Sequence, residues 1–292
     1  MMLFDDVALV LEGGGMRAAY SAGMVSALME ADLRFPFIAA VSAGGTIASC
    51  LLSDDRPRLR ASFVTMAEEP DFGGLGHFLR GKGYFNARYI YEDACQPDGT
   101  IPFDWQGYLA NDTDFAIGAF TRDTGEARWW TRKDVDSAED MGRIVRASSS
   151  LPIMMPATWI GGTCYVDGGL SESIPLSPAL VRGYKRFLII RTQEATYRKK
   201  EGSPALLSRA VGLAYPHLGT AMRTRPARYN RELAYCHRLV DRGAAYMMHP
   251  ATMPVDRGEL DPEALGQAFD LGLAQGRRDL PQVLAFLKGD RP

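Results

Sequence analysis

Two short apolar segments near the N-terminus each stop abruptly at a cluster of very small residues. Residues 7–11 lead into three consecutive glycines at 13–15, and residues 37–41 lead into a Ser-Ala-Gly-Gly turn at 42–45. An apolar stretch with helical spacing follows each turn. Strands that pass into helices through tight, small-residue turns are typical of βαβ units on a parallel sheet. The sequence therefore predicts an α/β fold.

Three later segments are predicted to add strands. Runs at 115–120 and 127–131, rich in aromatic and small apolar residues, flank an Asp-Thr-Gly turn, which predicts a hairpin. A Gly-Gly pair divides 159–166 into two short strands, and 187–191 is predicted as one more buried strand.

One helix is expected before residue 192, at 137–147. Beyond residue 192 helical patterns dominate, with candidates at 226–242, 262–275 and 281–287. The stretch 56–83, rich in glycine, arginine and acidic residues, is expected to form a mobile excursion.

The overall composition argues against several classes of protein. A formal net charge of −2 gives no reason to expect nucleic acid as a partner. The apolar runs are far shorter than the ~20 residues of a membrane span, and Asp5 and Asp6 lie where a signal peptide is apolar. The four cysteines form no CxxC pair, so we expect neither a metal site nor a disulfide framework. A cytoplasmic protein without a metal or organic cofactor is predicted.

Ser42 is the candidate nucleophile. A serine hydroxyl reacts poorly until a base removes its proton. A sharp strand-to-helix turn exposes the hydroxyl and aims the N–H groups of the helix N-terminus at developing negative charge. Such a turn needs small residues two positions before and after the serine, which here are Ala40 and Gly44. Taken alone, the pattern also fits an ordinary turn serine.

Gly13, Gly14 and Gly15 are candidates for an oxyanion site. Consecutive glycines let backbone N–H groups converge on an anion without obstruction by side chains. Donors aimed at a tetrahedral oxyanion are each worth roughly 2.7–4 kcal/mol. The alternative is a phosphate-binding turn for a nucleotide, but the motifs G-x-G-x-x-G and G-x-x-x-x-G-K-[ST] are absent. Arg17 either locks this loop, attracts an anionic substrate, or is a solvated arginine in the first helical turn.

Asp167 is the candidate base. It follows an apolar strand and precedes two glycines, which leave room for its carboxylate at the edge of a sheet. An Asp-Gly turn at a strand end is the structural alternative. His217, His237 and His249 follow Asp167 in the order of a Ser-Asp-His triad, although a packed or solvated histidine is the default expectation for each.

Together and in this order, these motifs resemble the patatin-like phospholipase family of acyl hydrolases. The family's G-G-G-x-[RK] loop matches 13–17, and its D-G-[GA] motif matches 167–169. Its G-x-S-x-G elbow matches 40–44, with Ala40 in place of the first glycine. Residues 147–152 are similar to its A-S-x-x-x-P segment. The resemblance covers roughly residues 7–191.

The resemblance implies a specific reaction and fold. A Ser42–Asp167 dyad without a catalytic histidine would hydrolyse carboxylic esters of phospholipids or lysophospholipids through an acyl-enzyme intermediate. The glycine loop and Arg17 would form the oxyanion hole. The implied fold is a three-layer α/β/α sandwich with a mainly parallel central sheet over 5–192, with a mostly helical extension over 193–292 packed on it. Because Ala40 adds a methyl group at the elbow, a catalytically weak lipid-binding regulator is the alternative.

Two further features bear on lipid binding. Met154 and Met155 are candidates for the lining of an acyl channel, with core packing as the alternative. Four arginines share one face of the helix predicted at 226–242, which predicts peripheral contact with an anionic membrane surface or, alternatively, a solvated helix face. These are Arg228, Arg231, Arg238 and Arg242.

Overall fold

The centre of the molecule is a sheet made mainly of parallel strands. The computed structural model describes residues 2–200 and 205–289. In order across the sheet, the strands are β10 (Ala245–Met248), β9 (Arg186–Ile190), β2 (Val7–Leu11), β4 (Phe37–Val41), β5 (Asp114–Thr121), β8 (Thr163–Asp167) and β7 (Thr158–Ile160), and β6 (Ala127–Trp130) also pairs with β5. The pairings from β10 to β5 are parallel, whereas β6, β7 and β8 pair antiparallel. Both predicted hairpins, β5–β6 and β7–β8, are confirmed.

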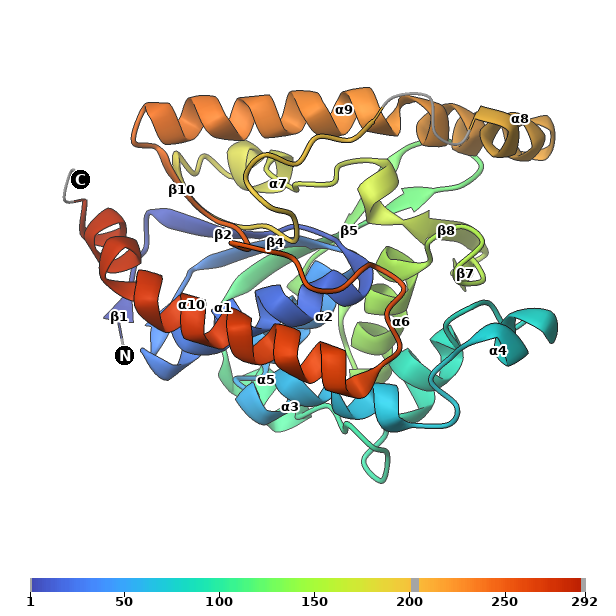
Figure 1. The fold of residues 1–292 in the computed structure, drawn as a ribbon, viewed down its shortest axis with the longest axis horizontal. Coiled ribbons are helices and arrows are strands. Elements are labelled where there is room, and N and C mark those ends of the chain that lie inside the picture. The colour runs from blue at the N-terminus through green and yellow to red at the C-terminus, as the bar shows by residue number, and fades with distance from the viewer. Residues whose placement is uncertain (1, 201–204, 290–292) are drawn as a thin grey trace.

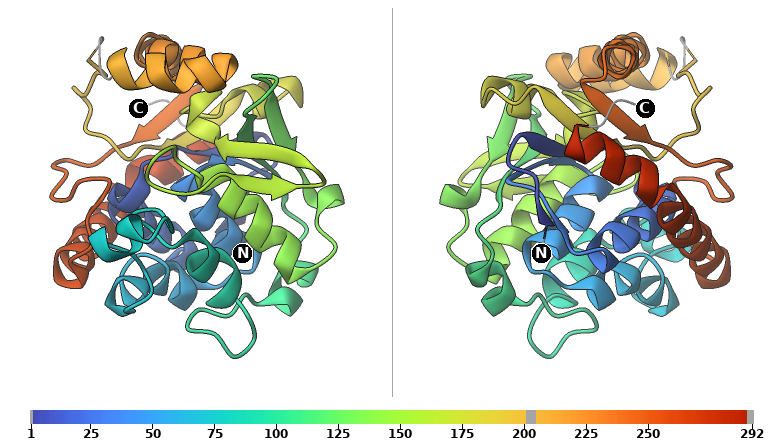
Figure 2. Two further views of the ribbon diagram at one scale, coloured as in Figure 1. Left: turned by 90° about the vertical axis from the view of Figure 1, so that its right-hand side faces the viewer. Right: turned by 90° about the vertical axis from the view of Figure 1, so that its left-hand side faces the viewer.

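Helices cover both faces of this sheet (Figures 1 and 2). The first face carries α1 (Ala18–Glu30), α2 (Ala43–Leu52), α6 (Ala138–Ser149) and α10 (Pro262–Lys288), and the second carries α7 (Ser177–Val181) and α9 (Pro216–Asp241). Successive side chains of a strand point to opposite faces, so neighbours in β2 belong to different cores. Leu9 packs in the first core and Val10 in the second. The three-layer α/β/α sandwich is therefore confirmed.

The remaining elements are short. They are β1 (Met2–Leu3) paired with β3 (Leu33–Arg34), α3 (Arg56–Ala61), α4 (Leu75–Leu79), α5 (Trp105–Ala110), α8 (Ala205–Ala214), and single turns η1 (Gly15–Arg17), η2 (Thr65–Glu68), η3 (Tyr89–Asp93), η4 (Arg132–Asp134) and η5 (Gly168–Leu170). None of the helices in the described ranges has the length and apolar character needed to cross a membrane.

The C-terminal helix α10 packs very closely on α1. A Cβ atom at Gly23 would lie 2.0 Å from the carbonyl oxygen of Phe269, and one at Gly272 would lie 2.0 Å from that of Tyr20. Only glycine permits such an approach of two backbones. Separate helices at 262–275 and 281–287 were the wrong prediction, because α10 continues through Pro281. Packing along α1 offsets the one backbone hydrogen bond that the proline removes.

Three other expectations differ from the structure. Helix α9 begins at Pro216 rather than at 226, and it continues through Pro226. The C-terminal part is not all helical, because β10 extends the sheet in parallel register with β9. The stretch 56–83 contains the helical segments α3, η2 and α4, and it buries Phe63 and Phe72. Apolar residues spaced through a polar segment were therefore enough to give it ordered local structure.

Candidate active site

Ser42 lies at the sharp turn between β4 and α2. Its backbone has φ 55° and ψ −133°, a conformation that is strained for a residue other than glycine. Gly44 is required next to it, because a Cβ atom there would lie 2.6 Å from the carbonyl oxygen of Leu11. Ala40 is fully buried in the core and does not line the cavity beside Ser42. The extra methyl group is thus accommodated away from the hydroxyl.

The strands that carry Ser42 and Asp167 end opposite one another along one edge of β5. β4 pairs with β5 as far as Gly118, and β8 pairs with β5 from Ala119 onward. β6 pairs with both Gly118 and Ala119. Since a strand has only two edges, β4 and β8 must share the edge opposite β6. They run in opposite directions, so their carboxyl ends meet there and bring Ser42 and Asp167 together.

Gly168 allows this meeting of the two strand ends. A Cβ atom at Gly168 would lie 2.1 Å from the carbonyl oxygen of Gly118 and 3.0 Å from Cγ1 of Val41. The glycine that follows the aspartate in the sequence motif is therefore explained by close approach of β8 to both neighbouring strands.

Serines at the end of α6 hold both strand ends. The N–H group of Ser42 donates to Oγ of Ser148 at 2.8 Å, and the Ser148 hydroxyl donates to the Gly118 carbonyl oxygen at 2.5 Å. Two residues later, the carbonyl oxygen of Ser150 accepts from the N–H group of Asp167 at 3.0 Å. The sequence pointed to this segment only by resemblance, and it did not assign a role to either serine.

Asp167 is buried, with one carboxylate oxygen occupied. Oδ1 accepts from the N–H group of Gly169 at 2.8 Å and lies 4.0 Å from Nη2 of Arg225. Nε of Arg225 donates to the Gly169 carbonyl oxygen at 3.1 Å. Among the described residues, no hydrogen-bond donor is found for Oδ2. The sequence analysis missed Arg225, because one arginine within a long helical pattern has no distinguishing spacing.

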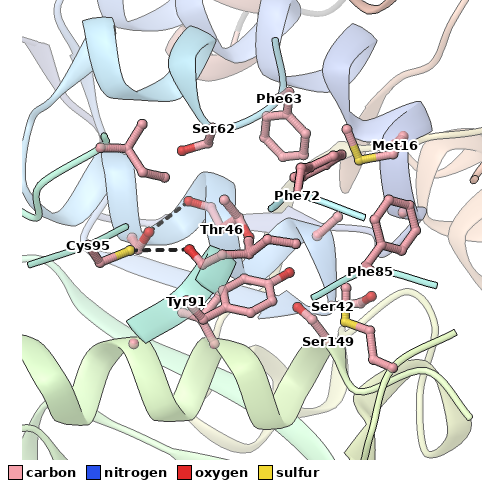
Figure 3. A pocket seen from close by; sticks show the side chains of 18 of the residues that line it. Met16, Ser42, Thr46, Ser62, Phe63, Phe72, Phe85, Tyr91, Cys95 and Ser149 are labelled. Atoms are coloured by element: carbon pink, nitrogen blue, oxygen red, sulfur yellow. Dashed lines mark hydrogen bonds between the residues drawn. The ribbon is translucent and has the colours of Figure 1, made fainter. Parts of the chain in front are cut away.

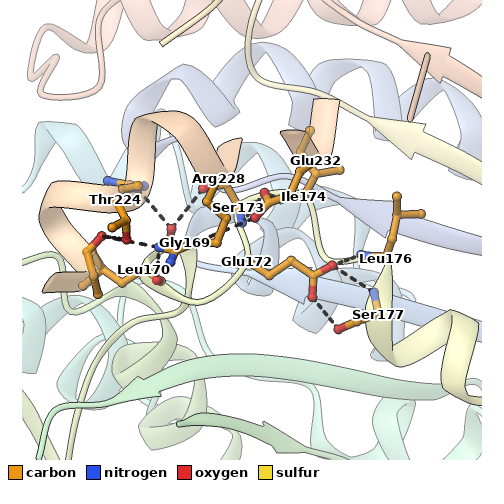
Figure 4. A network of polar contacts seen from close by, with 12 residues as sticks. Gly169, Leu170, Glu172, Ser173, Ile174, Leu176, Ser177, Thr224, Arg228 and Glu232 are labelled. Carbon is orange, nitrogen blue, oxygen red and sulfur yellow. Dashed lines mark hydrogen bonds and ion pairs between the residues drawn. The ribbon is translucent and has the colours of Figure 1, made fainter. Parts of the chain in front are cut away.

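Two partly buried carboxylates hold the loop after β8, one from α9 and one within the loop itself (Figure 4). Glu232 of α9 accepts from the N–H groups of Ser173 and Ile174 at 2.9 and 3.2 Å. Glu172 accepts from the N–H group of Ser177 at 2.9 Å. Burial raises the pKa of Glu232 to about 7, and burial also raises the pKa of Glu172.

The glycine loop packs directly against Ser42. A Cβ atom at Gly13 would lie 2.8 Å from Cβ of Ser42. Gly15 has a φ of +58°, a backbone conformation that favours glycine. In the part of the chain that the structure describes, the N–H groups of Gly13 and Gly14 have no hydrogen-bond partner. Unused backbone donors beside a serine are the geometry that oxyanion stabilisation requires.

A buried network of charged and polar side chains packs against the glycine loop. The Glu12 carboxylate accepts from the Thr192 N–H group at 2.9 Å and from the Tyr229 hydroxyl at 2.8 Å, and it lies 3.6 Å from Nε of Arg191. The Thr192 hydroxyl donates to the Gly13 carbonyl oxygen at 3.0 Å. These contacts, which the sequence analysis did not anticipate, join β2, β9 and α9 beneath the glycines.

Arg17 is held at the side of the loop. With the Gln193 amide oriented to satisfy both groups, Nη2 and Nε of Arg17 donate to its oxygen at 2.9 and 3.1 Å. Burial lowers the pKa of Arg17, and the nearby Glu12 carboxylate opposes that effect. These contacts favour a locking role over a solvated arginine.

A narrow apolar cavity begins at Ser42. Its free volume is about 80 Å³, and Figure 3 shows Ser42 and Phe85 at one end with Cys95 at the other. Both Met154 and Met155 line it, and both also pack against the first core. The other apolar lining residues include Phe63, Phe72, Ile90, Ile101, Phe103, Met141 and Val145.

The histidines lie elsewhere. Nε2 of His77 lies 3.3 Å from the Pro70 carbonyl oxygen, and Nδ1 of His249 lies 3.3 Å from that of Pro250. Of the side chains that the structure describes, no histidine lines the Ser42 cavity or hydrogen-bonds to Asp167. Nor is any group of three or more His, Cys, Asp or Glu side chains in the described ranges arranged to hold a metal ion.

The predicted arginine face of α9 is divided in the structure. Arg228 turns toward the protein, where it donates to the Leu170 carbonyl oxygen and lies 3.9 Å from Glu232. The prediction of a single arginine face was therefore wrong for Arg228. The other three arginines, Arg231, Arg238 and Arg242, are exposed.

The fold and this geometry define an α/β protein with a serine at a strand-to-helix elbow, a glycine loop and an aspartate at the facing strand end. Sequence comparison agrees: the family model described as patatin-like phospholipase matches residues 9–180. The chain belongs to the patatin-like phospholipase family. A second model, described as a domain of unknown function (DUF6363), matches residues 215–288.

Individual relatives are distant. The uncharacterized protein YjjU of Escherichia coli is 25% identical over 189 residues, which are 64% of this chain and 52% of YjjU. The lysophospholipase NTE1 of Cryptococcus neoformans is 25% identical over 186 residues, 64% of this chain and 11% of NTE1. The chain thus spans about half the length of the first relative and a small part of the second. VipD of Legionella pneumophila has a similar fold, with a TM-score of 0.51 at 11% identity, over 98% of this chain and 67% of VipD.

Proposed function

We propose that this protein hydrolyses carboxylic esters of lipids, with Ser42 as nucleophile and Asp167 as base. The observation that carries the proposal is the meeting of the β4 and β8 ends beside a loop with unused N–H donors. Membership of the patatin-like phospholipase family supports the same reaction class.

In the first half of the proposed reaction, Oγ of Ser42 attacks the ester carbonyl carbon as its proton passes to Oδ2 of Asp167. The negative charge that develops on the carbonyl oxygen is stabilised by N–H groups of Gly13, Gly14 and Gly15. Arg17 contributes by holding the loop through Gln193. Asp167 then gives its proton to the departing alcohol, and an acyl ester remains on Ser42.

In the second half, Asp167 takes a proton from a water molecule, which attacks the acyl ester and releases the fatty acid. Ser42 recovers its proton, and the cycle closes without a metal or organic cofactor. The narrow apolar cavity is proposed to hold the acyl chain, because its walls are mainly aromatic and aliphatic.

The alternative of a weakly catalytic lipid-binding regulator gains no support from Ala40, which is buried away from the cavity. We also propose that residues 5–192 supply the chemistry and that residues 193–292 shape the surroundings of the site. Arg225 and the backbone of Arg257 contact catalytic segments from that second region.

Hydrolysis of a chromogenic acyl ester tests the proposal. Ser42→Ala and Asp167→Asn are each expected to lower kcat by about 10³-fold or more, because the two groups act as one unit. Ser26→Ala and Asp123→Asn, which alter the same residue types away from the site, are matched controls expected to keep wild-type rates. Wild-type activity in either site variant would refute the dyad.

A further inference from the structure

A second cavity adjoins the one at Ser42. It has a volume of about 600 Å³, and it shares Leu151, Met154 and Arg257 with the narrow apolar cavity. Much of its wall comes from residues 197–200 and from α9. A molecule bound at Ser42 would therefore have this wider space at its other end.

The second cavity, here termed the basic cavity, is lined by five cationic side chains. No acidic side chain is among the described residues that line it. In contrast, the apolar cavity is walled mainly by hydrocarbon. The five cations are Arg198, Lys199, Lys200, Arg225 and Arg257.

Lys199 and Arg257, two of the five cations, form no ion pair with a carboxylate of the described residues. The ammonium of Lys199 lies over the Tyr229 ring, 4.1 Å from its centroid. Within the described part of the chain, the exposed guanidinium of Arg257 has neither a hydrogen-bond nor an ion-pair partner. Arg225 lies 4.0 Å from Asp167. Burial lowers the pKa of Lys199 to about 7, and the neighbouring Arg225 lowers it as well. A bound anion would relieve this repulsion.

Arg257 connects the basic cavity to the glycine loop. Its carbonyl oxygen accepts from the N–H group of Met16 at 3.2 Å, and a Cβ atom at Gly15 would lie 2.5 Å from that oxygen. The same residue lines both cavities. A cation in this position lies between the acyl chain and the headgroup of a lipid whose ester is at Ser42.

We propose that the basic cavity binds the phosphate of an anionic lipid headgroup, with Lys199 and Arg257 as its principal contacts. The inference rests on the proposed function and adds the headgroup class to it. Guanidinium and ammonium groups form charge-assisted hydrogen bonds to phosphate oxygens. A choline or ethanolamine headgroup brings a cation of its own, and none of the lining residues that the structure describes has a carboxylate to receive it. Lipids whose headgroup has a net negative charge are therefore preferred.

Binding to the Ser42→Ala protein tests this site without requiring turnover. Titration calorimetry would compare 1-octanoyl-glycerol 3-phosphate, 1-octanoyl-glycero-3-phosphocholine and 1-octanoylglycerol, which share one acyl chain. The anionic lipid is expected to bind at least about 10-fold more tightly than the other two. Adding Lys199→Gln and Arg257→Gln together should bring its affinity to within about 2-fold of the neutral lipid. The main-chain contacts of Lys199 with Asn230 remain in this variant.

Arg242→Gln is the matched control, because it removes one exposed positive charge at the far end of α9. It should leave all three affinities unchanged. Equal affinity for the three lipids would overturn the proposal, as would an equal loss for charged and neutral lipids in the double variant.

Inorganic phosphate distinguishes the two sources of the anion. For a headgroup site, it should compete at least 100-fold more weakly than the anionic lipid. Competition at equal concentration would instead make free phosphate the ligand and would overturn the headgroup assignment. If all lipids bind as predicted but the wild-type protein hydrolyses none, the proposed function fails while the binding site stands.

Discussion

The apolar cavity and the basic cavity share a border but have opposite chemistry. The first is narrow and built by segments between residues 15 and 155, together with Arg257. The second is wide, and its cations come from residues 198–257. The family match ends at residue 180, so the cationic wall belongs to the part of the chain beyond it. In the proposed function, reaction chemistry and headgroup preference therefore come from separate stretches of sequence.

A change in the glycine loop should slow the hydrolysis of anionic and neutral esters by the same factor. In Gly13→Ala, the new methyl group would lie 2.8 Å from Cβ of Ser42, so the loop must move away from the reacting carbonyl. The loss of one oxyanion donor is expected to lower kcat by about 10²–10³-fold. Steady-state kinetics with anionic and neutral esters should show the same factor for both. A loss confined to the anionic ester would place the loop in headgroup binding instead.

A change at the far end of the apolar cavity should slow the hydrolysis of long-chain esters but not of short-chain esters. Cys95→Phe fills the end opposite Ser42, which denies space to roughly two methylene groups. At about 0.8 kcal/mol per methylene, kcat/KM for a hexadecanoyl ester should fall by about 15-fold. A butanoyl ester should be hydrolysed at the wild-type rate. Cys95→Ala is the control and should not discriminate against the long chain. Equal losses on both esters would mean that the acyl chain does not enter this cavity.

The smallest expected effect concerns the loop after β8, which Glu232 holds to α9. Glu232 has a pKa of about 7 in the folded protein, above its ordinary value near 4.5, so the folded state holds the proton more tightly. Its contribution to stability is present below about pH 4.5 and is lost as the pH rises toward 7. Glu232→Gln stays neutral, and its amide oxygen can accept the same two N–H groups.

Thermal unfolding at pH 5 and pH 8 measures this contribution. Between these values, the wild-type protein should lose about 1–3 kcal/mol more stability than Glu232→Gln. Glu139→Gln alters an exposed glutamate and should follow the wild-type profile. Parallel profiles for wild type and Glu232→Gln would show that this carboxylate titrates normally.

Local sequence patterns predicted the features that depend on neighbouring residues. The turn at Ser42, both hairpins and the buried strands follow from the small residues at the turns and from the apolar and β-branched runs beside them. Gly44 and Gly168 were identified by motif, and their contacts with Leu11 and Gly118 now give the physical reason.

Features that depend on distant contacts were not predicted. The prolines Pro226 and Pro281 indicated breaks, but packing of the long helices on the rest of the protein outweighs the local cost. Ser148 and Arg225 reach the site across the fold, at sequence separations that no local pattern encodes. The prediction that 56–83 is mobile did not take account of its apolar residues, which line the narrow apolar cavity.

Labelling with a fluorophosphonate probe, followed by peptide mass spectrometry, tests the central claim most directly. An activated serine beside an aspartate and an oxyanion site reacts covalently with this reagent, whereas an ordinary serine does not. Rapid, stoichiometric modification of the peptide containing Ser42, and its disappearance in Asp167→Asn, is the predicted result. No labelling of the folded wild-type protein, or labelling at a different serine, would contradict the account.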